Sequence, residues 1–340
     1  MKIADPNDDV GDKNTREKTD GSVVTDADVA AQYIIVRAVR TVSEAVNFVG
    51  EESQAEMEQI KKDYDYLDQD ILAKTRQELY LRKEKKTSST YPLGSAELDP
   101  SLPAEVSFDD ESAVVDASRV TIIVDPLDGT KSYTQGEYDT VSVLIAIILD
   151  NKPLFGVIGK PVGYTGYTPI TGTDCVTFYG GPLLDGVFIA GGDEVVKNPV
   201  LSTEEGVSSD DLPRAVISGS RSKGVVQDFC IHMGEEGLIY PEPLLISGAG
   251  EKSVRLILQQ KNEAIWFYPK PGTSIWDVAA PDALLRSLGG KVTDKYGKDM
   301  DYSRHREDFE NMEGVVACID EALHSKCIEL FQKDDWLERK

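Results

Sequence analysis

The stretch "TIIVDPLDGTKSY", residues 121–133, runs an apolar strand directly into two aspartates. Aspartate is depleted in strands, and its carboxylate is costly to bury without a partner. Pro126 fixes the backbone φ angle at the strand end, and Gly129 lets the chain bend close to a ligand. Asp125 and Asp128 can therefore point at one place, where something must require negative charge.

The residue types in this stretch fit a site for a metal ion and a phosphate. Two carboxylates and the carbonyl oxygen of Leu127 are hard ligands of the kind that Mg²⁺ prefers. Thr130 can begin a helix whose free N–H groups face a phosphate. The alternative is an ordinary turn, because Asp-Pro and Asp-Gly are common turn dipeptides.

Further acids stand at the ends of predicted elements. Glu51 and Glu52 follow the apolar run "VNFV", and Asp28 lies three residues after a predicted N-cap at Thr25. Asp277 falls in the first turn of a predicted helix. Each acid has an ordinary explanation in a solvated loop, a capping box or a favourable helix dipole. Together they are typical of α/β active sites, which gather side chains from the ends of several elements.

Composition limits the classes of partner. The chain has 340 residues, 40% of them hydrophobic, which is enough for about two domains with a sizeable core. A net charge of −24 argues against nucleic acid and anionic membranes as partners. A small polyanionic substrate is compatible with that charge, because bound cations invert the local field. The longest apolar run, 143–149, is too short to span a bilayer and predicts a buried central strand.

Cysteines and histidines exclude other chemistries. The four cysteines form neither a CxxC pair nor a dense disulfide pattern, which predicts reduced thiols in a cytoplasmic protein. Residues 1–22 are polar and show no signal peptide. The three histidines lack a metal-ligand spacing, so a zinc site or a Ser-His-Asp triad is disfavoured. We expect carboxylates to carry any catalytic chemistry.

The order of predicted elements indicates two parts. The first part contains a helix from residue 26, charged helical sequence over 53–86, strands at 46–49, 120–124 and 141–149, a hairpin over 174–190, and a polar linker over 191–211. After Pro213, strands and helices alternate, which predicts an α/β domain. The helices there are expected from about 223, over 251–260 and 276–288, and at the C-terminal end, with strands at 214–218, 244–247, 264–268, 291–294 and 314–319.

The motifs "GEE" (50–52), "DPLDGT" (125–130) and "WD" (276–277), in this order, closely resemble the Mg²⁺-dependent, lithium-sensitive phosphomonoesterase superfamily of inositol monophosphatase-like proteins. The resemblance runs from about Lys18 to Phe331. Four longer strings are most like its 3′(2′),5′-bisphosphate nucleotidase branch: "VDPLDGTKSYTQG", "GVIGKP", "SGAGEKSVRLI" and "PGTSIWDVAAPDALLRSLGGKVTD". The implied fold is α/β with αβαβα layers, divided into an α+β domain over 1–212 and an α/β domain over 213–340.

The resemblance also implies roles for individual residues. Two or three Mg²⁺ ions would be held by Glu51, Asp125, Asp128, Asp277 and the Leu127 carbonyl. Asp28 and Thr130 would orient and deprotonate the attacking water, with Glu52 as a helper, and Gly129 and Thr130 would hold the scissile phosphate. The second domain would contact the substrate through Ser220, Lys223, Gly248 and Lys252. The two lysines also have an ordinary interpretation as surface residues.

The implied activity is hydrolysis of the 3′-phosphate of adenosine 3′,5′-bisphosphate to AMP and phosphate, with its phosphosulfate form as a further substrate. Inhibition by Li⁺ and a monomeric state are implied by the resemblance alone. One alternative keeps the chemistry and acts on inositol 1,4-bisphosphate, with dual activity open. Another is a non-catalytic Mg²⁺- and phosphate-binding protein, which is disfavoured because no ligand or water-orienting residue is lost.

The sequence departs from the nucleotidase pattern in three places. The family usually has a helix ahead of the "TDGS…TDAD" region. Only the polar residues 1–22 lead into this region here, so we expect that helix to be shortened or absent. Lys223 stands where the pattern tends to carry histidine, and residues 63–119 have no assignable match.

Overall fold

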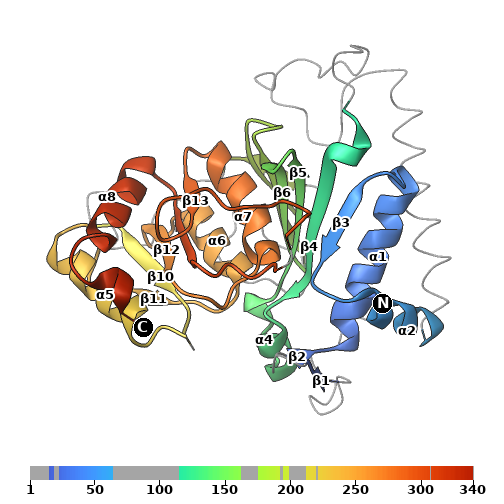
Figure 1. Cartoon of the computed structure of the whole chain (residues 1–340), viewed down its shortest axis with the longest axis horizontal. Coiled ribbons are helices and arrows are strands. Elements are labelled where there is room, and N and C mark those ends of the chain that lie inside the picture. The colour runs from blue at the N-terminus through green and yellow to red at the C-terminus, as the bar shows by residue number, and fades with distance from the viewer. Residues whose placement is uncertain are drawn as a thin grey trace.

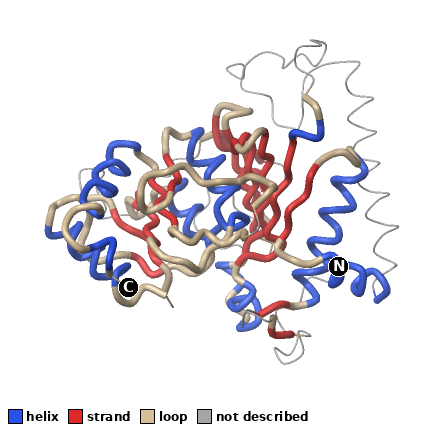
Figure 2. The backbone as a smooth tube through the Cα atoms, viewed as in Figure 1, coloured by secondary structure: helices blue, strands red, loops and turns tan. Residues whose placement is uncertain are grey.

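The computed structural model describes residues 15–18, 23–63, 115–161, 175–191, 194–198, 212–219, 221–306 and 308–339. Two β-sheets stand face to face with a pair of helices between them, and further helices cover the outer face of each sheet (Figures 1 and 2). This arrangement confirms the predicted αβαβα layers.

The first sheet has seven strands in the order β3-β4-β5-β6-β7-β8-β9. Their bounds are β3 Asn47–Gly50, β4 Val120–Asp128, β5 Ser142–Leu149, β6 Lys152–Lys160, β7 Val176–Gly181, β8 Gly186–Gly191 and β9 Glu194–Lys197. Strands β3 and β4 are parallel and the other neighbours antiparallel. The apolar run 143–149 lies in the interior strand β5, as predicted. Outside this sheet lie α1 (Asp26–Val42) and α2 (Gln54–Asp63), next to the small ribbon of β1 (Arg16–Glu17) and β2 (Val23–Val24).

The second sheet has five strands in the order β11-β10-β12-β14-β13. These are β10 Arg214–Ile217, β11 Leu244–Leu245, β12 Glu263–Tyr268, β13 Lys291–Thr293 and β14 Val315–Cys318, with α5 (Val225–Glu235) and α8 (Glu321–Phe331) on the outer face. The predicted alternation of strands and helices is confirmed. The remaining short helices are α4 Thr130–Gln135, η2 Ala117–Arg119, η3 Tyr138–Thr140 and η4 Trp336–Glu338.

Helices α6 (Ala249–Leu258) and α7 (Ile275–Ser287) fill the space between the sheets. Most of the circumference of α7 is apolar and buried, as expected for a helix covered on both sides. Gly156 of β6 has no room for a Cβ atom, which would overlap the carbonyl oxygen of Ala280. Because α7 lies directly on the sheet, its first turn is held at a fixed place near the end of β4.

Some predicted bounds were wrong. The polar linker over 191–211 was expected to contain no strand, but Glu194–Lys197 pairs with β8 as β9; its two valines are too few for a clear pattern. The strand expected to end at residue 124 continues to Asp128 after a register irregularity, and the helix predicted over 251–260 begins at Ala249. Predictions for 64–114, for most of the linker and for Ser220 lie outside the described residues.

The two sheets lie on either side of the residue 212/213 boundary, which itself stays a prediction. No disulfide joins the four cysteines, all of which lie in described segments, and three of them are buried. In the described part of the chain, no helix has the length and apolar character needed to cross a membrane.

Candidate functional site

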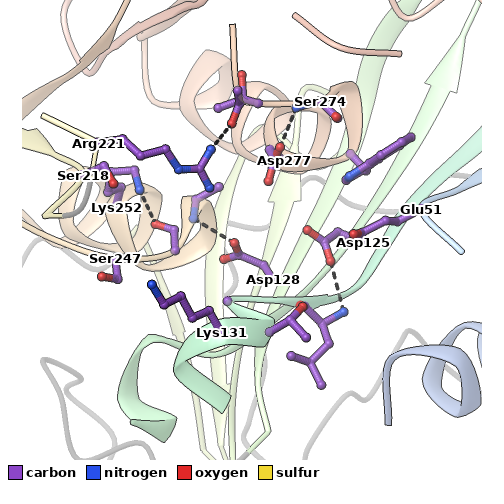
Figure 3. Close-up of a pocket in the computed structure, with 18 of the residues that line it drawn as sticks. Glu51, Asp125, Asp128, Lys131, Ser218, Arg221, Ser247, Lys252, Ser274 and Asp277 are labelled. Carbon is purple, nitrogen blue, oxygen red and sulfur yellow. Dashed lines mark hydrogen bonds between the residues drawn. The ribbon is translucent and has the colours of Figure 1, made fainter. Parts of the chain in front are cut away.

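Three carboxylates meet where β4, α6 and α7 come together. Ligand atoms of Asp125, Asp128 and Asp277 all lie within 4.8 Å of one another. Figure 3 shows these side chains pointing into a common space, with Glu51 beside them. All four line a cavity of about 1030 Å³, and we call them its acidic side. The structure thus brings together the four acids that the sequence predicted as metal ligands.

Local backbone features fix two of these acids. Asp125 Oδ1 accepts a hydrogen bond from the Leu127 N–H at 3.0 Å, inside the irregular end of β4. Asp277 Oδ2 accepts from the Ser274 N–H at 2.5 Å, because Asp277 is the third residue in a capping box at the start of α7. The expected favourable place in the first turn of a helix is therefore a capping box, which the sequence analysis assigned only to Asp28. This capping role does not exclude a metal site, because the same carboxylate also points into the cavity.

The acidic side has the electrostatics of a cation site. Burial, with Glu51, Asp128 and Asp277 close by, raises the pKa of Asp125 well above its ordinary value. Burial and the nearby Asp128 carboxylate raise the pKa of Asp277 to about 7. Like charges this close are unfavourable unless a proton or a cation offsets them. A set of hard carboxylate oxygens fits Mg²⁺ in this position.

Asp128 is bound by the first turn of α6. Its Oδ1 accepts from the Ala249 N–H at 2.9 Å and its Oδ2 from the Gly250 N–H at 2.7 Å. Gly248, the N-cap of α6, has a φ of +75°, and a Cβ there would approach the Thr140 carbonyl oxygen to 2.6 Å. Gly248 lines the cavity, as predicted for a substrate contact, and it also lets α6 begin against Asp128.

Glu51 and Glu52 share a cation that the sequence analysis did not single out. Lys18 Nζ lies 3.0 Å from Glu51 Oε1 and 2.9 Å from Glu52 Oε1. Burial opposes the charge of Lys18, but the two carboxylates raise its pKa above the ordinary value. Burial and Glu51 raise the pKa of Glu52 to about 7, and Glu52 does not line the acidic cavity. Lys18 lies 33 and 34 residues before these two glutamates, so its contact with them is visible only in the folded structure.

Thr130 connects the cavity with Asp28. Its hydroxyl lies 2.9 Å from Asp28 Oδ1 and 3.0 Å from the Leu127 carbonyl oxygen. Asp28 is fully buried in a capping box with Thr25, and burial raises its pKa. Thr130 and Gly129 line the cavity, whereas Asp28 stands behind them. Asp28 can therefore act on a bound molecule only through Thr130.

Lys131, Arg221 and Lys252 line the other part of the cavity, and we call them its basic side (Figure 3). Lys252 is buried; its Nζ donates to the Gly248 carbonyl at 2.8 Å and lies 5.1 Å from the centre of the Trp266 ring. Burial lowers the pKa of Lys252 to about 8, so it is mostly charged at neutral pH. Arg221 Nη1 donates to the Gly272 carbonyl at 2.5 Å.

The basic side differs from the sequence prediction. Lys252 lines the cavity, whereas Lys223 is exposed and does not line it, so its substrate contact stays a prediction. Arg221, two residues earlier in the same "GSRSKG" string, lines the cavity instead. Lys131 directly follows "DPLDGT". Both missed cations could have been found by testing every basic residue within two positions of a motif.

The chain matches known proteins along most of its length. A sequence model described as "Inositol monophosphatase family" matches residues 3–334. The 3′(2′),5′-bisphosphate nucleotidase 1 of Dictyostelium discoideum is 28% identical over 317 residues, which cover 91% of this chain and 85% of that protein. The human protein of the same name is 31% identical over 59% of this chain and 58% of its own length. Inositol monophosphatase 3 of Danio rerio is 30% identical over 56% of this chain and 48% of its own.

Solved structures share the fold at low sequence identity. A structure titled IMPase/NADP phosphatase complexed with NADP and Ca²⁺ at pH 7.0 has a TM-score of 0.53 at 13% identity, covering 96% of this chain and 88% of that one. Staphylococcal IMPase-I complexed with products has a TM-score of 0.52 at 14% identity, covering 94% and 86%. With the sequence match over residues 3–334, these findings place the chain in the inositol monophosphatase family of phosphatases.

Proposed function

We propose that this protein is a Mg²⁺-dependent phosphatase that hydrolyses the 3′-phosphate of adenosine 3′,5′-bisphosphate, giving AMP and phosphate, and that also accepts the phosphosulfate form. One observation carries the proposal: a single cavity has a carboxylate cluster on one side and three cations on the other. The acidic side suits a cation-bound scissile phosphate. The basic side suits a second anionic group on the same small molecule.

The chain's residues divide the chemistry between them. Glu51, Asp125, Asp128, Asp277 and the Leu127 carbonyl would hold Mg²⁺, which lowers the pKa of bound water and neutralises charge on the transferring phosphoryl group. Gly129 and Thr130 would hold the scissile phosphate. The Thr130 hydroxyl orients the attacking water, and Asp28 receives its proton through Thr130. The water oxygen bonds to phosphorus while the bond from phosphorus to the 3′-oxygen breaks. The leaving 3′-oxygen takes a proton from solvent water to become a hydroxyl, and Asp28 then releases the proton it received to solvent.

Aromatic rings favour a nucleotide over an inositol phosphate. Trp266, Tyr268, Trp276 and Phe309 line the same cavity, and the last two have ring centres 5.9 Å apart. Trp266 and Tyr268 are buried, but Trp276 and Phe309 are partly exposed. An adenine ring can stack on these two rings, whereas inositol has no π-face to offer. The similarity to two bisphosphate nucleotidases supports the same choice.

Inositol 1,4-bisphosphate is the second candidate substrate, favoured by the match to inositol monophosphatase 3. The two candidates are distinguished by measuring phosphate release from each in Mg²⁺ and comparing kcat/KM, with AMP as the monophosphate control. We expect the adenosine bisphosphate to be at least about 10-fold better, since its base and second phosphate both find partners. Chromatography of the product must show AMP; a higher kcat/KM for the inositol substrate overturns the nucleotide assignment.

A further inference from the structure

The "GVIGKP" string contains a lysine, Lys160, that no step of the proposed reaction uses. Lys160 is the last residue of β6, and its side chain is only 1% exposed. Its Nζ lies 3.0 Å from Oε2 of Glu251 and 3.3 Å from the Ser142 hydroxyl oxygen. Glu251 is on α6 and is 3% exposed, so a buried ion pair joins the seven-stranded sheet to a helix between the sheets.

The Lys160–Glu251 pair lies one step from Asp128 along two routes. Along the sheet, Asp128 pairs with Ser142, and Lys160 reaches the Ser142 side chain from the next strand. Along α6, Glu251 directly follows Gly250, whose N–H donates to Asp128 Oδ2. A Cβ on Gly250 would lie 2.5 Å from Ser142 Oγ, so the first turn of α6 rests directly on the sheet. The two routes form a closed ring of contacts around Asp128.

Stability alone does not account for this pair. Two charges removed from water cost more than an apolar pair of similar volume, and a buried pair often adds nothing to stability. Glu251 also has a second cation, Arg255, whose Nε lies 2.7 Å from its Oε1. Lys160 instead has an orienting role: its ion pair with Glu251 holds the first turn of α6 in a fixed position relative to the end of β6.

We infer that Lys160 and Glu251 are positioning residues: their ion pair holds the first turn of α6 against the sheet, so that the Ala249 and Gly250 amides orient the Asp128 carboxylate for its cation. Neither side chain lines the cavity, so both act through Asp128. The inference rests on the proposed function only in giving Asp128 a cation to bind.

The test uses the full chain with two variants, Lys160→Met and the double variant Lys160→Met, Glu251→Gln. The double variant removes both charges, and so avoids the cost of a buried charge left without its partner. The first readout is hydrogen exchange of the Ala249 and Gly250 amides, followed by NMR without metal. The second is the Mg²⁺ midpoint from calorimetric titration without substrate. We expect both variants to exchange these amides faster and to raise the midpoint about 10-fold or more, as for other residues that orient a metal ligand.

Val316→Ala is the matched control, because it removes buried methyl groups from β14 in the other sheet and leaves Asp128 untouched. It should lower the melting temperature without changing either readout. If the double variant keeps wild-type exchange and a wild-type Mg²⁺ midpoint, the pair is only structural and the inference is overturned. Loss of amide protection and Mg²⁺ affinity in a protein that hydrolyses no phosphate ester would support the inference and overturn the proposed function alone.

Discussion

The acidic and basic sides of the cavity are built in opposite ways. Backbone geometry places the acids: Asp125 and Asp128 end one strand, and Asp277 occupies a capping position of α7. The basic side depends on long side chains that extend from α4, from the loop before α5 and from α6. Short carboxylates on fixed backbone suit chemistry that tolerates little displacement. The cationic residues of the basic side can be substituted without displacing the carboxylates. The preferred substrate can therefore change while the same hydrolysis reaction is kept.

Without a bound ligand, the acidic side and the basic side of the cavity both lower the stability of the folded protein. The pKa of Asp277, about 7, is raised by burial and then by repulsion from Asp128, and the pKa of Lys252, about 8, is lowered by burial of its cation. Cations bound to the acids and anions bound to the lysine relieve both costs. The ligand-free protein therefore keeps the two sides at some expense in stability, which is a common property of active sites.

Removing one acid tests the acidic side most severely. Asp125→Asn deletes a charged ligand at the centre of the cluster, and we expect turnover of the adenosine bisphosphate to fall about 10³-fold or more. In EDTA the same variant should melt at a higher temperature than the wild type, because one buried like charge is gone. Steady-state kinetics and thermal unfolding in EDTA measure the two effects. Full turnover would contradict the role of Asp125 as a metal ligand needed for the reaction.

The acidic side was readable from the sequence because its signals are local. "DPLDGT" holds two acids within one strand end, and Asp277 falls in the first turn of a helix that the sequence pattern predicts. The sheet-and-helix alternation after Pro213 was readable for the same reason. Patterns of this kind need no knowledge of distant contacts.

The basic side and the ion pairs could not be read in this way. Lys18 meets Glu51 and Glu52 across 33 and 34 residues, and Asp128 meets the α6 amides across 121 and 122. Nothing in the string "GSRSKG" says that Arg221 rather than Lys223 faces the cavity; that depends on how the chain leaves β10. Sequence therefore predicted where the chemistry lies better than it predicted what the site recognises.

Thr130→Ala tests the link between the acidic side and Asp28. Loss of the hydroxyl should lower kcat about 10²-fold with KM little changed, as expected when a water-orienting group is removed. Thr134→Ala is the control on the same helix, since its hydroxyl donates only to the Lys131 carbonyl. Equal kcat values for the two variants would contradict the role given to Thr130 and Asp28.

Lys252→Met tests the basic side while keeping most of the buried volume. We expect KM for the adenosine bisphosphate to rise about 10-fold, with a smaller change for a monophosphate substrate that lacks the second anionic group. Lys223→Met is the matched control, because that lysine is exposed and does not line the cavity. The assignment fails if both substrates lose equally, or if Lys223→Met has the larger effect.

The smallest effect, a few degrees in melting temperature, couples pH to metal binding. Asp277 and Glu52 have folded-state pKa values of about 7, above their ordinary values near 4. A raised carboxyl pKa favours folding at low pH, and that contribution is lost as pH rises through 7. In EDTA, the melting temperature should therefore fall between pH 5 and pH 8. Mg²⁺ binds the deprotonated carboxylate of Asp277, which lines the cavity, and not that of Glu52, which pairs with Lys18. The stabilisation that Mg²⁺ adds should therefore grow over the same range.

Comparing Mg²⁺ with EDTA at each pH isolates the cavity from other titrating groups. Burial also raises the pKa of Asp282, to about 6, but Asp282 pairs with Arg286 and does not line the cavity. The effect of Asp282 titration on the melting temperature is therefore the same in Mg²⁺ and in EDTA, and it cancels when one melting temperature is subtracted from the other. A Mg²⁺-dependent gain in melting temperature that stayed constant from pH 5 to pH 8 would mean that the buried acids are not the cation site. The electrostatic contrast between the two sides would then have to be explained without a bound metal.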